Sequence, residues 1–133
     1  MDPLPDWEAG TPAVLAVAGP HAIPISTAVR RGDFRVVFAL GRRRDTLARI
    51  VEDPAAALTV LGAGVAFTAY GRARVIREEL DAAPVAAIEL SVDLVQDHLA
   101  DGRTEMVDGA RWRWIDAKAA ESDPRIRAEL GAL

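Results

Sequence analysis

Apolar and polar residues alternate with a period of two along much of the chain, which is the pattern of β-strands that bury one face. The longest example spans residues 65–77, where small and apolar residues oppose polar ones: Phe67, Ala69, Gly71, Ala73 and Val75 against Thr68, Tyr70, Arg72 and Arg74. Residues 34–40 and 85–95 alternate in the same way. The pattern predicts strands over these three segments, each with one face in a core.

Two further segments, 13–18 and 55–61, are continuous apolar runs that end at glycine-containing turns. Runs of this length are typical of strands covered on both faces. Residues 21–29 follow the first run at hairpin distance and alternate again. Pro24 in that segment donates no ladder hydrogen bond, which indicates an edge, a bulge or a ligand-facing position.

The hydrophobic period changes to that of a helix after Gly41. Asp45 or Thr46 can cap the start of this helix. Asp53-Pro54 ends it, because the residue before a proline disfavours helical geometry. The expected apolar stripe consists of Leu47, Ile50 and Val51. The sequence therefore predicts a short central helix near residues 45–52, at the side of the sheet.

The C-terminal third combines a turn signal with a helix signal. Asp108-Gly109 is a two-residue turn signal and predicts a hairpin, with Trp112 and Trp114 on a common face after it. Ser122-Asp123-Pro124 predicts the start of a short helix with proline at the first helical position, within a C-terminal tail of residues 117–133.

These segments amount to six or seven strands, one short central helix and one short C-terminal helix. Hairpin-length connections make the sheet largely antiparallel and Greek-key-like. Strands this short close most easily into a barrel, which removes exposed edges. We expect a single, mainly β domain over residues 1–133, with residues 1–11 as a lead-in.

Composition narrows the function classes. The 133 residues carry a formal charge of −4, which argues against a nucleic-acid partner. The chain has no cysteine, which excludes disulfides and thiolate chemistry, and its two histidines are too few for a typical multi-histidine metal site. No apolar run approaches the roughly 18 residues of a membrane-spanning helix, and no signal peptide is recognisable. We expect a cytoplasmic protein with no metal and no membrane partner, and its abundant Arg and Ala are typical of a bacterial, high-GC genome.

Three consecutive arginines stand between a predicted strand and the predicted helix: Arg42, Arg43 and Arg44, followed by Thr46. Backbone N–H groups at a helix start attract anions, and guanidinium groups bind phosphate in a bidentate way. This turn is therefore a candidate phosphate site. A solvated basic turn explains the same run, and taken alone it is the commoner outcome.

Two further features suit a flat ligand. Small side chains share one face of residues 21–29 and leave room against the sheet: Ala22, Pro24, Ser26 and Ala28. Packing beneath the helix is the alternative reading of that face. Trp112 and Trp114 can cover a flat cofactor or an apolar substrate, although core or interface packing is the commoner role of such residues. No catalytic acid, base or nucleophile is recognisable, so the catalytic residues stay unknown.

The order of these features resembles the FMN-binding split barrels, also called the pyridoxamine 5'-phosphate oxidase-like family. Residues 34–61, FRVVFALGRRRDTLARIVEDPAAALTVL, are similar to that family's strand, basic turn, short helix, Asp-Pro stop and apolar strand. Residues 65–75, VAFTAYGRARV, resemble the long strand that follows, and residues 13–29, AVLAVAGPHAIPISTAV, resemble the opening hairpin. The resemblance runs from Thr11 to Ile76 and more loosely to Trp114. It implies a split β-barrel.

In that family FMN or a deazaflavin lies in a groove shared by two subunits, so the resemblance implies a homodimer. By position, it implies that the phosphate meets Arg42, Arg43, Arg44 and Thr46. The ring edge would meet the second strand and the end of the third, here Ile25, Ser26, Thr27, Phe38 and Ala39. Trp112, which can cover a flat cofactor, completes the set of candidate residues.

The chain departs from the family's pattern in two places. Many members carry a lysine and then an asparagine on the short helix, where this chain has Thr46 and Arg49. That leaves FMN, a deazaflavin or no cofactor open. The Trp- and Arg-rich C-terminal signature of pyridoxamine phosphate oxidases themselves is not recognisable, because Trp112-Arg113-Trp114 is too short to match it. A role in vitamin B6 metabolism is therefore not implied.

The leading hypothesis is an oxidoreductase that uses FMN, or alternatively a deazaflavin coenzyme, to transfer a hydride to or from a small organic substrate. The first alternative is a non-catalytic binding protein for a flavin, a haem or another small ligand. The second is a cofactor-free dimer with a structural or regulatory role.

Overall fold

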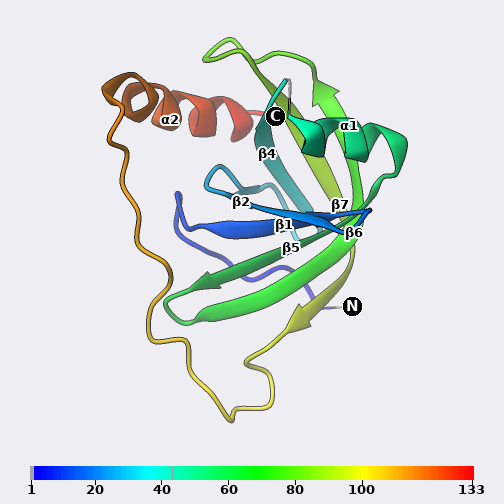
Figure 1. Cartoon of the computed structure of the whole chain (residues 1–133). Helices are drawn as coiled ribbons and strands as arrows, with labels where there is room; N and C mark the ends of the chain where they lie inside the picture. Colours follow the sequence, from blue (N-terminus) through cyan, green and yellow to red (C-terminus); the bar gives the residue numbers. More distant parts are fainter. Residues whose placement is uncertain (1, 43) are drawn as a thin grey trace.

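The computed structural model describes residues 2–42 and 44–133, so Arg43 lies outside the described residues. Within these ranges the chain forms one sheet in the order β2-β1-β5-β6-β7-β4-β3, with every neighbouring pair antiparallel (Figure 1). The strands are β1 (Ala13–Val17), β2 (His21–Ile25), β3 (Val29–Arg30), β4 (Arg35–Gly41), β5 (Ala55–Gly62), β6 (Val65–Arg77) and β7 (Val85–Asp97). The predicted antiparallel β architecture is confirmed.

The inner face of the curled sheet holds the main core. Alternate side chains of the four central strands are fully buried there, and for β4, β6 and β7 the period-two pattern predicted this: Val36, Phe38, Leu58, Val60, Phe67, Ile88 and Leu90. Burying an apolar side chain of this size stabilises the fold by roughly 1.5–3 kcal/mol. A second, smaller cluster around Val37, Leu80 and Leu130 lies on the other side of β4 and β7.

The apolar runs 13–18 and 55–61 are covered on one face only. Leu15 and Leu58 point into the core, whereas Val14 and Leu61 remain exposed. The expectation of strands covered on both faces is therefore wrong for the single chain, because this part of the sheet is one layer thick. The seventh strand comes from a break in residues 21–29, which form β2 and the separate two-residue β3.

The two edge strands, β2 and β3, are consecutive in sequence, so residues 26–28 carry the chain from one edge of the sheet to the other. The gap in the barrel lies at this crossing. Thr27 bridges it, since its Oγ1 accepts from Ala39 N at 3.1 Å and donates to Ala39 O at 3.4 Å. These bonds satisfy backbone groups that a continuous barrel would pair with another strand.

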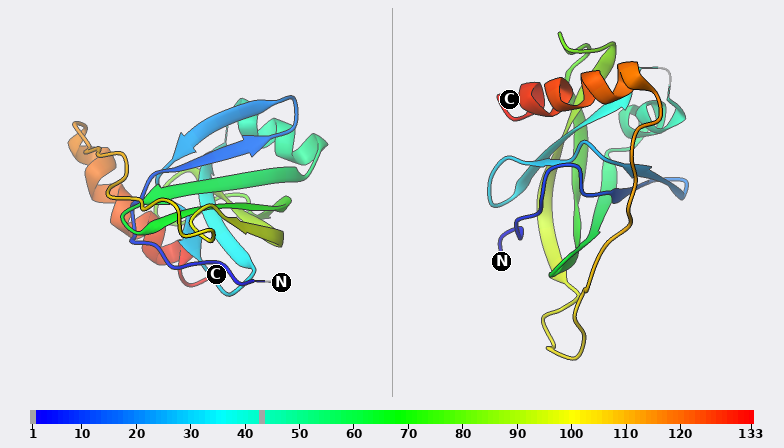
Figure 2. Two further views of the ribbon diagram at one scale, coloured as in Figure 1. Left: turned by 90° about the horizontal axis from the view of Figure 1, so that it is seen from below. Right: turned by 90° about the vertical axis from the view of Figure 1, so that its left-hand side faces the viewer.

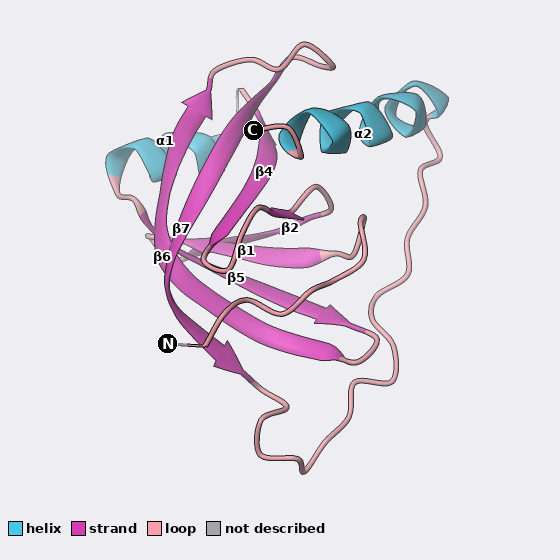
Figure 3. Ribbon diagram, turned by 180° about the vertical axis from the view of Figure 1, so that it is seen from behind, coloured by secondary structure: helices cyan, strands magenta, loops and turns pink. Residues whose placement is uncertain are grey.

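Two helices lie at opposite sides of one end of the sheet (Figures 1 and 3). The first, α1 (Asp45–Glu52), occupies the predicted segment and buries Ile50. Its N-cap is Arg44, without a side-chain cap. The expectation that Asp45 or Thr46 caps the helix is wrong, because both are inside it and the Thr46 hydroxyl, fully buried, hydrogen-bonds to His21 Nε2 at 2.9 Å.

The second helix, α2 (Ala117–Leu130), begins earlier than the Ser122-Asp123-Pro124 signal predicted, and Pro124 lies inside it. Asp116 is the stronger start signal, because its carboxylate accepts from the backbone N–H groups of Lys118 and Ala119. Neither helix has the length and apolar composition that a membrane crossing needs, within the described ranges.

Residues 104–116, which we call the strap, follow the turn after β7 and pass the β5–β6 turn on the way to α2 (yellow to orange in Figures 1 and 2). Residues 104–114 form no strand, so the hairpin predicted at Asp108-Gly109 is wrong. Asp108 instead accepts a hydrogen bond from Arg111 Nη2 at 2.8 Å. The strap is held against the β5–β6 turn, where Gly64 N donates to Met106 O at 2.8 Å.

Glu89 is a buried charge on β7, with 7% of its surface exposed. It accepts hydrogen bonds from Arg35 Nε of β4 and from Arg74 Nε of β6, the latter at 3.0 Å. Burial raises the pKa of the Glu89 carboxyl, but these two arginines outweigh it and the net pKa is lowered. The ionised carboxylate therefore ties three strands together.

Replacing Glu89 with glutamine is expected to lower the free energy of unfolding at neutral pH by about 1–3 kcal/mol. Because the folded pKa lies below the unfolded value, Glu89 contributes stability above about pH 4.5 that is lost as the pH falls through the folded pKa. In urea unfolding between pH 7 and pH 3, the free energy of unfolding should fall less steeply with falling pH for Glu89→Gln than for the parent. The exposed Glu52→Gln variant is the control, and identical acid limbs for Glu89→Gln and the parent would contradict this role.

Candidate functional site

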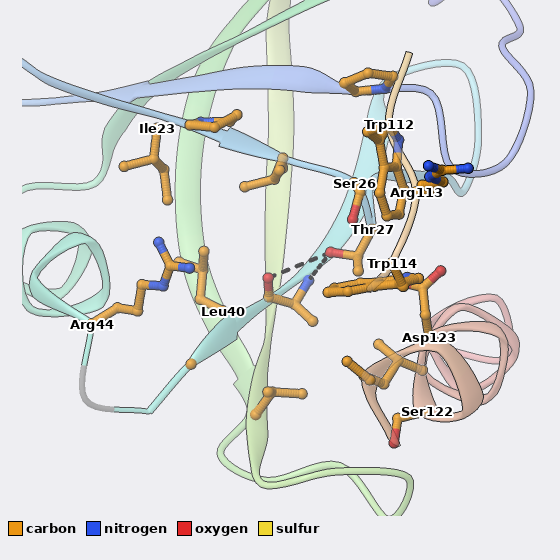
Figure 4. A pocket seen from close by; sticks show the side chains of 18 of the residues that line it. Ile23, Ser26, Thr27, Leu40, Arg44, Trp112, Arg113, Trp114, Ser122 and Asp123 are labelled. Atoms are coloured by element: carbon orange, nitrogen blue, oxygen red, sulfur yellow. Dashed lines mark hydrogen bonds between the residues drawn. The ribbon is translucent and has the colours of Figure 1, made fainter. Parts of the chain in front are cut away.

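A groove of about 680 Å³ lies at the gap in the barrel (Figure 4). One wall is β2, the residues after it and the end of β4, and the opposite wall is the strap and the first half of α2. The lining residues include Ile23, Pro24, Ile25, Ser26, Thr27, Ala39, Leu40, Gly41, Arg44, Val85, Trp112, Arg113, Trp114, Ser122, Asp123 and Ile126. Pockets of this volume bind small molecules and organic cofactors.

The walls of the groove are mainly apolar. On the sheet side, small residues such as Ala39 and Gly41 leave the backbone close to the cavity. On the strap side, Trp112 and Trp114 pack edge to face, with ring centroids 5.2 Å apart. Trp112 is fixed by a hydrogen bond from its Nε1 to Gly10 O at 3.0 Å. Both tryptophans remain about 40% exposed, which leaves ring surface for a ligand to cover.

Arg44, at the start of α1, lines the groove and gives this end of it a positive charge. The negative charge of the neighbouring Asp45 is balanced by Arg49, whose Nε donates to it at 2.8 Å. Asp45 therefore does not neutralise Arg44. That hydrogen bond is the main reason why the pKa of the Asp45 carboxyl is lowered. Arg44 and the first turn of α1 therefore present a net attraction for an anionic group.

The opposite wall carries a buried carboxylate. Asp123 lies on α2 with only 4% of its surface exposed, and it lines the groove. Its Oδ2 accepts from Arg127 Nη1, one helical turn further on, at 2.6 Å. Its Oδ1 is buried and has no hydrogen-bond partner among the described residues. Figure 4 shows Asp123 and Arg44 on opposite sides of the groove.

The groove brings together six of the ten candidate residues: Ile25, Ser26, Thr27, Ala39, Arg44 and Trp112. Three others lie elsewhere. Phe38 is fully buried in the core, Thr46 bonds to His21 beneath α1, and Arg42 Nη1 bonds to Glu79 at 3.4 Å. The tenth, Arg43, lies outside the described residues.

Sequence reasoning missed the contribution of α2. Ser122 and Asp123 were considered only as part of a helix start, and Ile126 carried no signal at all. Trp114 was singled out with Trp112, but without a place in the site. These positions are about 100 residues from β2, so no local pattern could indicate that they share its groove.

No protein-family model matches this sequence, and no curated protein matches it. Solved structures do match. HupZ from Group A Streptococcus has a TM-score of 0.57 at 12% identity, with 76% of this chain and 90% of that one covered. An F420 reductase also has a TM-score of 0.57, at 14% identity over 67% of this chain and 91% of that one. A FAD-binding protein from Mesorhizobium loti has a TM-score of 0.54, at 13% identity over 65% of this chain and 84% of that one.

These likenesses, together with that to a candidate pyridoxamine 5'-phosphate oxidase from Listeria innocua (TM-score 0.55, 14% identity, 66% of this chain and 88% of that one), establish the fold. The chain has the split-barrel architecture of pyridoxamine 5'-phosphate oxidase-like and flavin-binding proteins. The split barrel that the sequence predicted is thereby confirmed.

The residues of the groove fit a flavin better than a haem. A flavin needs flat apolar walls, a cation for its phosphate and polar partners for its ring edge, and the groove offers all three. A haem iron needs an axial His, Cys, Met or Tyr. None of these residue types lines the groove, within the described part of the chain.

Proposed function

We propose that this protein is an oxidoreductase that binds FMN, or alternatively a deazaflavin coenzyme, in the groove at the gap of the barrel. The observation that supports the proposal most is the groove itself. It combines apolar walls and exposed indole rings with two arginines, Arg44 at the end next to α1 and Arg113 on the strap.

Each wall has a distinct part in this proposal. Arg44 and the start of α1 bind the phosphate. Ile25, Ser26 and Ala39 contact the ring system on the sheet side, while Trp112 and Trp114 cover it and exclude water. Thr27 holds the sheet-side wall in place through its two bonds to Ala39. When bound, the cofactor supplies the hydride chemistry, and the protein supplies position and local charge.

The proposal is tested by titrating the purified protein with FMN and with a deazaflavin and measuring binding as the quenching of tryptophan fluorescence. Saturable quenching by either cofactor is expected, because two tryptophans line the groove. Hydride transfer from reduced nicotinamide to the bound cofactor, or from it to a small acceptor, then separates an oxidoreductase from a non-catalytic binding protein. A protein that binds neither cofactor contradicts the proposal.

We further propose that the protein is a homodimer. The outer face of the sheet exposes apolar side chains on neighbouring strands: Val14 of β1, Leu61 of β5, Tyr70 of β6 and Leu94 of β7. Tyr70 and Leu94 are direct partners in the register of β6 and β7. Exposed apolar side chains on four neighbouring strands indicate an interaction surface, and a second copy would cover the strand faces that the single chain leaves open.

Replacing Leu94, which is 55% exposed, with glutamate is expected to shift the protein from dimer to monomer at micromolar concentration. A carboxylate in the middle of an apolar interface loses its hydration without gaining a partner. Sedimentation velocity measures the outcome. The control is Val51→Glu on the exposed side of α1, which should stay dimeric. A monomeric parent protein would contradict the proposed dimer.

A further inference from the structure

Gly10, in the lead-in that precedes β1, lies where two parts of the groove wall meet. Its carbonyl oxygen accepts a hydrogen bond from Trp112 Nε1 at 3.0 Å. A Cβ atom at this position would lie 3.0 Å from Arg127 Nη1 of α2. Trp112 lines the groove directly, and Arg127 holds Asp123, which also lines it. The strap and α2 therefore both come close to the chain at Gly10.

The lead-in is itself fixed to the barrel, which makes Gly10 a firm support. Leu4 is buried in the main core, and Trp7 Nε1 donates to Ala28 O at 3.1 Å. The Trp7 ring packs against the core residue Phe67, with ring centroids 5.5 Å apart. These contacts hold the lead-in independently of the strap.

The backbone conformation at Gly10 is one that glycine adopts readily and other residues do not. Its φ angle is +83°, in the left-handed region, within the turn of residues 8–11. A residue with a side chain relaxes toward negative φ, and that rotation would swing the carbonyl group away from Trp112. The Cβ atom would also press on Arg127 Nη1, the nitrogen that bonds to Asp123 Oδ2 at 2.6 Å. Both effects act on the outer wall of the groove.

The part of the strap that lines the groove depends on this contact. Residues 104–114 form no strand, so no ladder of backbone hydrogen bonds holds them. The hydrogen bond to the β5–β6 turn, at Met106, lies outside the part that lines the groove. The bond from Trp112 to Gly10 lies inside it, and Trp112 in turn packs against Trp114.

We propose that Gly10 is a positioning residue that sets the outer wall of the groove for the flavin. The inference rests on the proposed function, because this wall is the one that covers the ring system. Held at Gly10, the rings of Trp112 and Trp114 face the sheet-side wall across the groove (Figure 4). A flat ring system then enters a slot of set width, and little freedom is lost on binding because the wall is already ordered.

The test replaces Gly10 with alanine and measures FMN binding by calorimetry. The variant is expected to bind FMN about three- to tenfold more weakly than the parent, the effect of losing one neutral hydrogen bond. Gly102→Ala is the matched control, because Gly102 has a φ of +69° but a Cβ there would meet no atom within 4 Å. Both variants carry the same kind of backbone strain, and the control is expected to bind FMN within about twofold of the parent.

A second measurement needs no ligand. Two indole rings 5.2 Å apart couple their electronic transitions, so the Trp112–Trp114 pair contributes a paired circular-dichroism signal in the far ultraviolet. Trp114→Phe removes the pair and thereby identifies the signal. Gly10→Ala is expected to weaken this signal and Gly102→Ala to keep it. A purely structural role of Gly10 would leave the signal of the folded variant unchanged.

If Gly10→Ala does not fold, the other partner of the hydrogen bond provides the test. Trp112→Phe and Trp114→Phe each keep an aromatic ring in the groove, and the two tryptophans are 41% and 42% exposed. Trp112 is the one that donates to Gly10. Trp112→Phe is therefore expected to weaken FMN binding about three- to tenfold more than Trp114→Phe, and equal losses would overturn the proposal.

The outcomes distinguish this inference from the proposed function. If the parent binds FMN and Gly10→Ala binds it as tightly, or keeps the paired signal of the tryptophans, the positioning role of Gly10 is overturned and the flavin site stands. The same holds if Gly102→Ala loses as much affinity as Gly10→Ala, because backbone strain then explains the loss. If the parent binds neither FMN nor a deazaflavin, the proposed function and this inference fall together.

Discussion

Replacing Gly71 with alanine is expected to lower the free energy of unfolding by about 3 kcal/mol or more. A Cβ atom at this position would lie 1.9 Å from Ser91 O and 3.0 Å from Val92 Cα. Both atoms belong to the backbone of β7, so no side-chain rotation relieves the clash. The two longest strands would have to separate at the centre of the sheet.

The close approach at Gly71 arises from a break in register. Tyr70 pairs with Leu94 but Gly71 pairs with Val92, so β7 carries an extra residue at this point. Such a bulge bends the strand and presses its backbone toward its neighbour. A glycine is therefore needed because of packing against β7, and its φ angle is not the reason.

Urea denaturation of Gly71→Ala, with Gly41→Ala as the control, measures this cost. Gly41 is also in a strand, but a Cβ there would meet only the flexible Arg44 side chain, at 3.3 Å. The control is expected to lose less than about 1 kcal/mol. A Gly71→Ala protein as stable as the Gly41→Ala protein would show that β6 and β7 adjust without cost.

Local periodicity was sufficient to predict β4, β6, β7 and α1. Residues 34–40 and 65–77 alternate cleanly because each strand buries one face, and Asp53-Pro54 ends α1 where the sequence indicated. The signals that failed depended on distant partners. A two-residue turn forms a hairpin only if the flanking segments pair, and residues 104–114 pack on other parts of the chain instead.

Gly109 shows why its turn signal was misleading. A Cβ at this position would lie 2.4 Å from Leu61 O, so the glycine allows the strap to approach the end of β5 closely. The residue serves long-range packing, which a local pattern cannot reveal. The same limit applies to the site: the sheet-side residues could be proposed by resemblance, whereas the place of Asp123 depends on how the strap and α2 return to the barrel.

The proposed phosphate site makes the sharpest prediction about the arginine run. Arg44 lines the groove, while Arg42 points to Glu79 at 3.4 Å and does not line it. The two residues share their type, their turn and their exposure to solvent. Arg42 is therefore a matched control for Arg44, which a comparison of unrelated positions would not provide.

Replacing Arg44 with alanine is expected to weaken FMN binding roughly ten- to a hundredfold, because a charge-assisted hydrogen bond to phosphate contributes about 1.5–3 kcal/mol. Riboflavin, which has no phosphate, should bind the variant and the parent almost equally. Arg42→Ala should leave the binding of both ligands unchanged. Calorimetry with FMN and riboflavin on the parent and the two variants gives the six dissociation constants needed.

If Arg44→Ala binds FMN as tightly as the parent, the turn is a solvated basic surface. If both ligands weaken together, Arg44 shapes the groove without contacting phosphate.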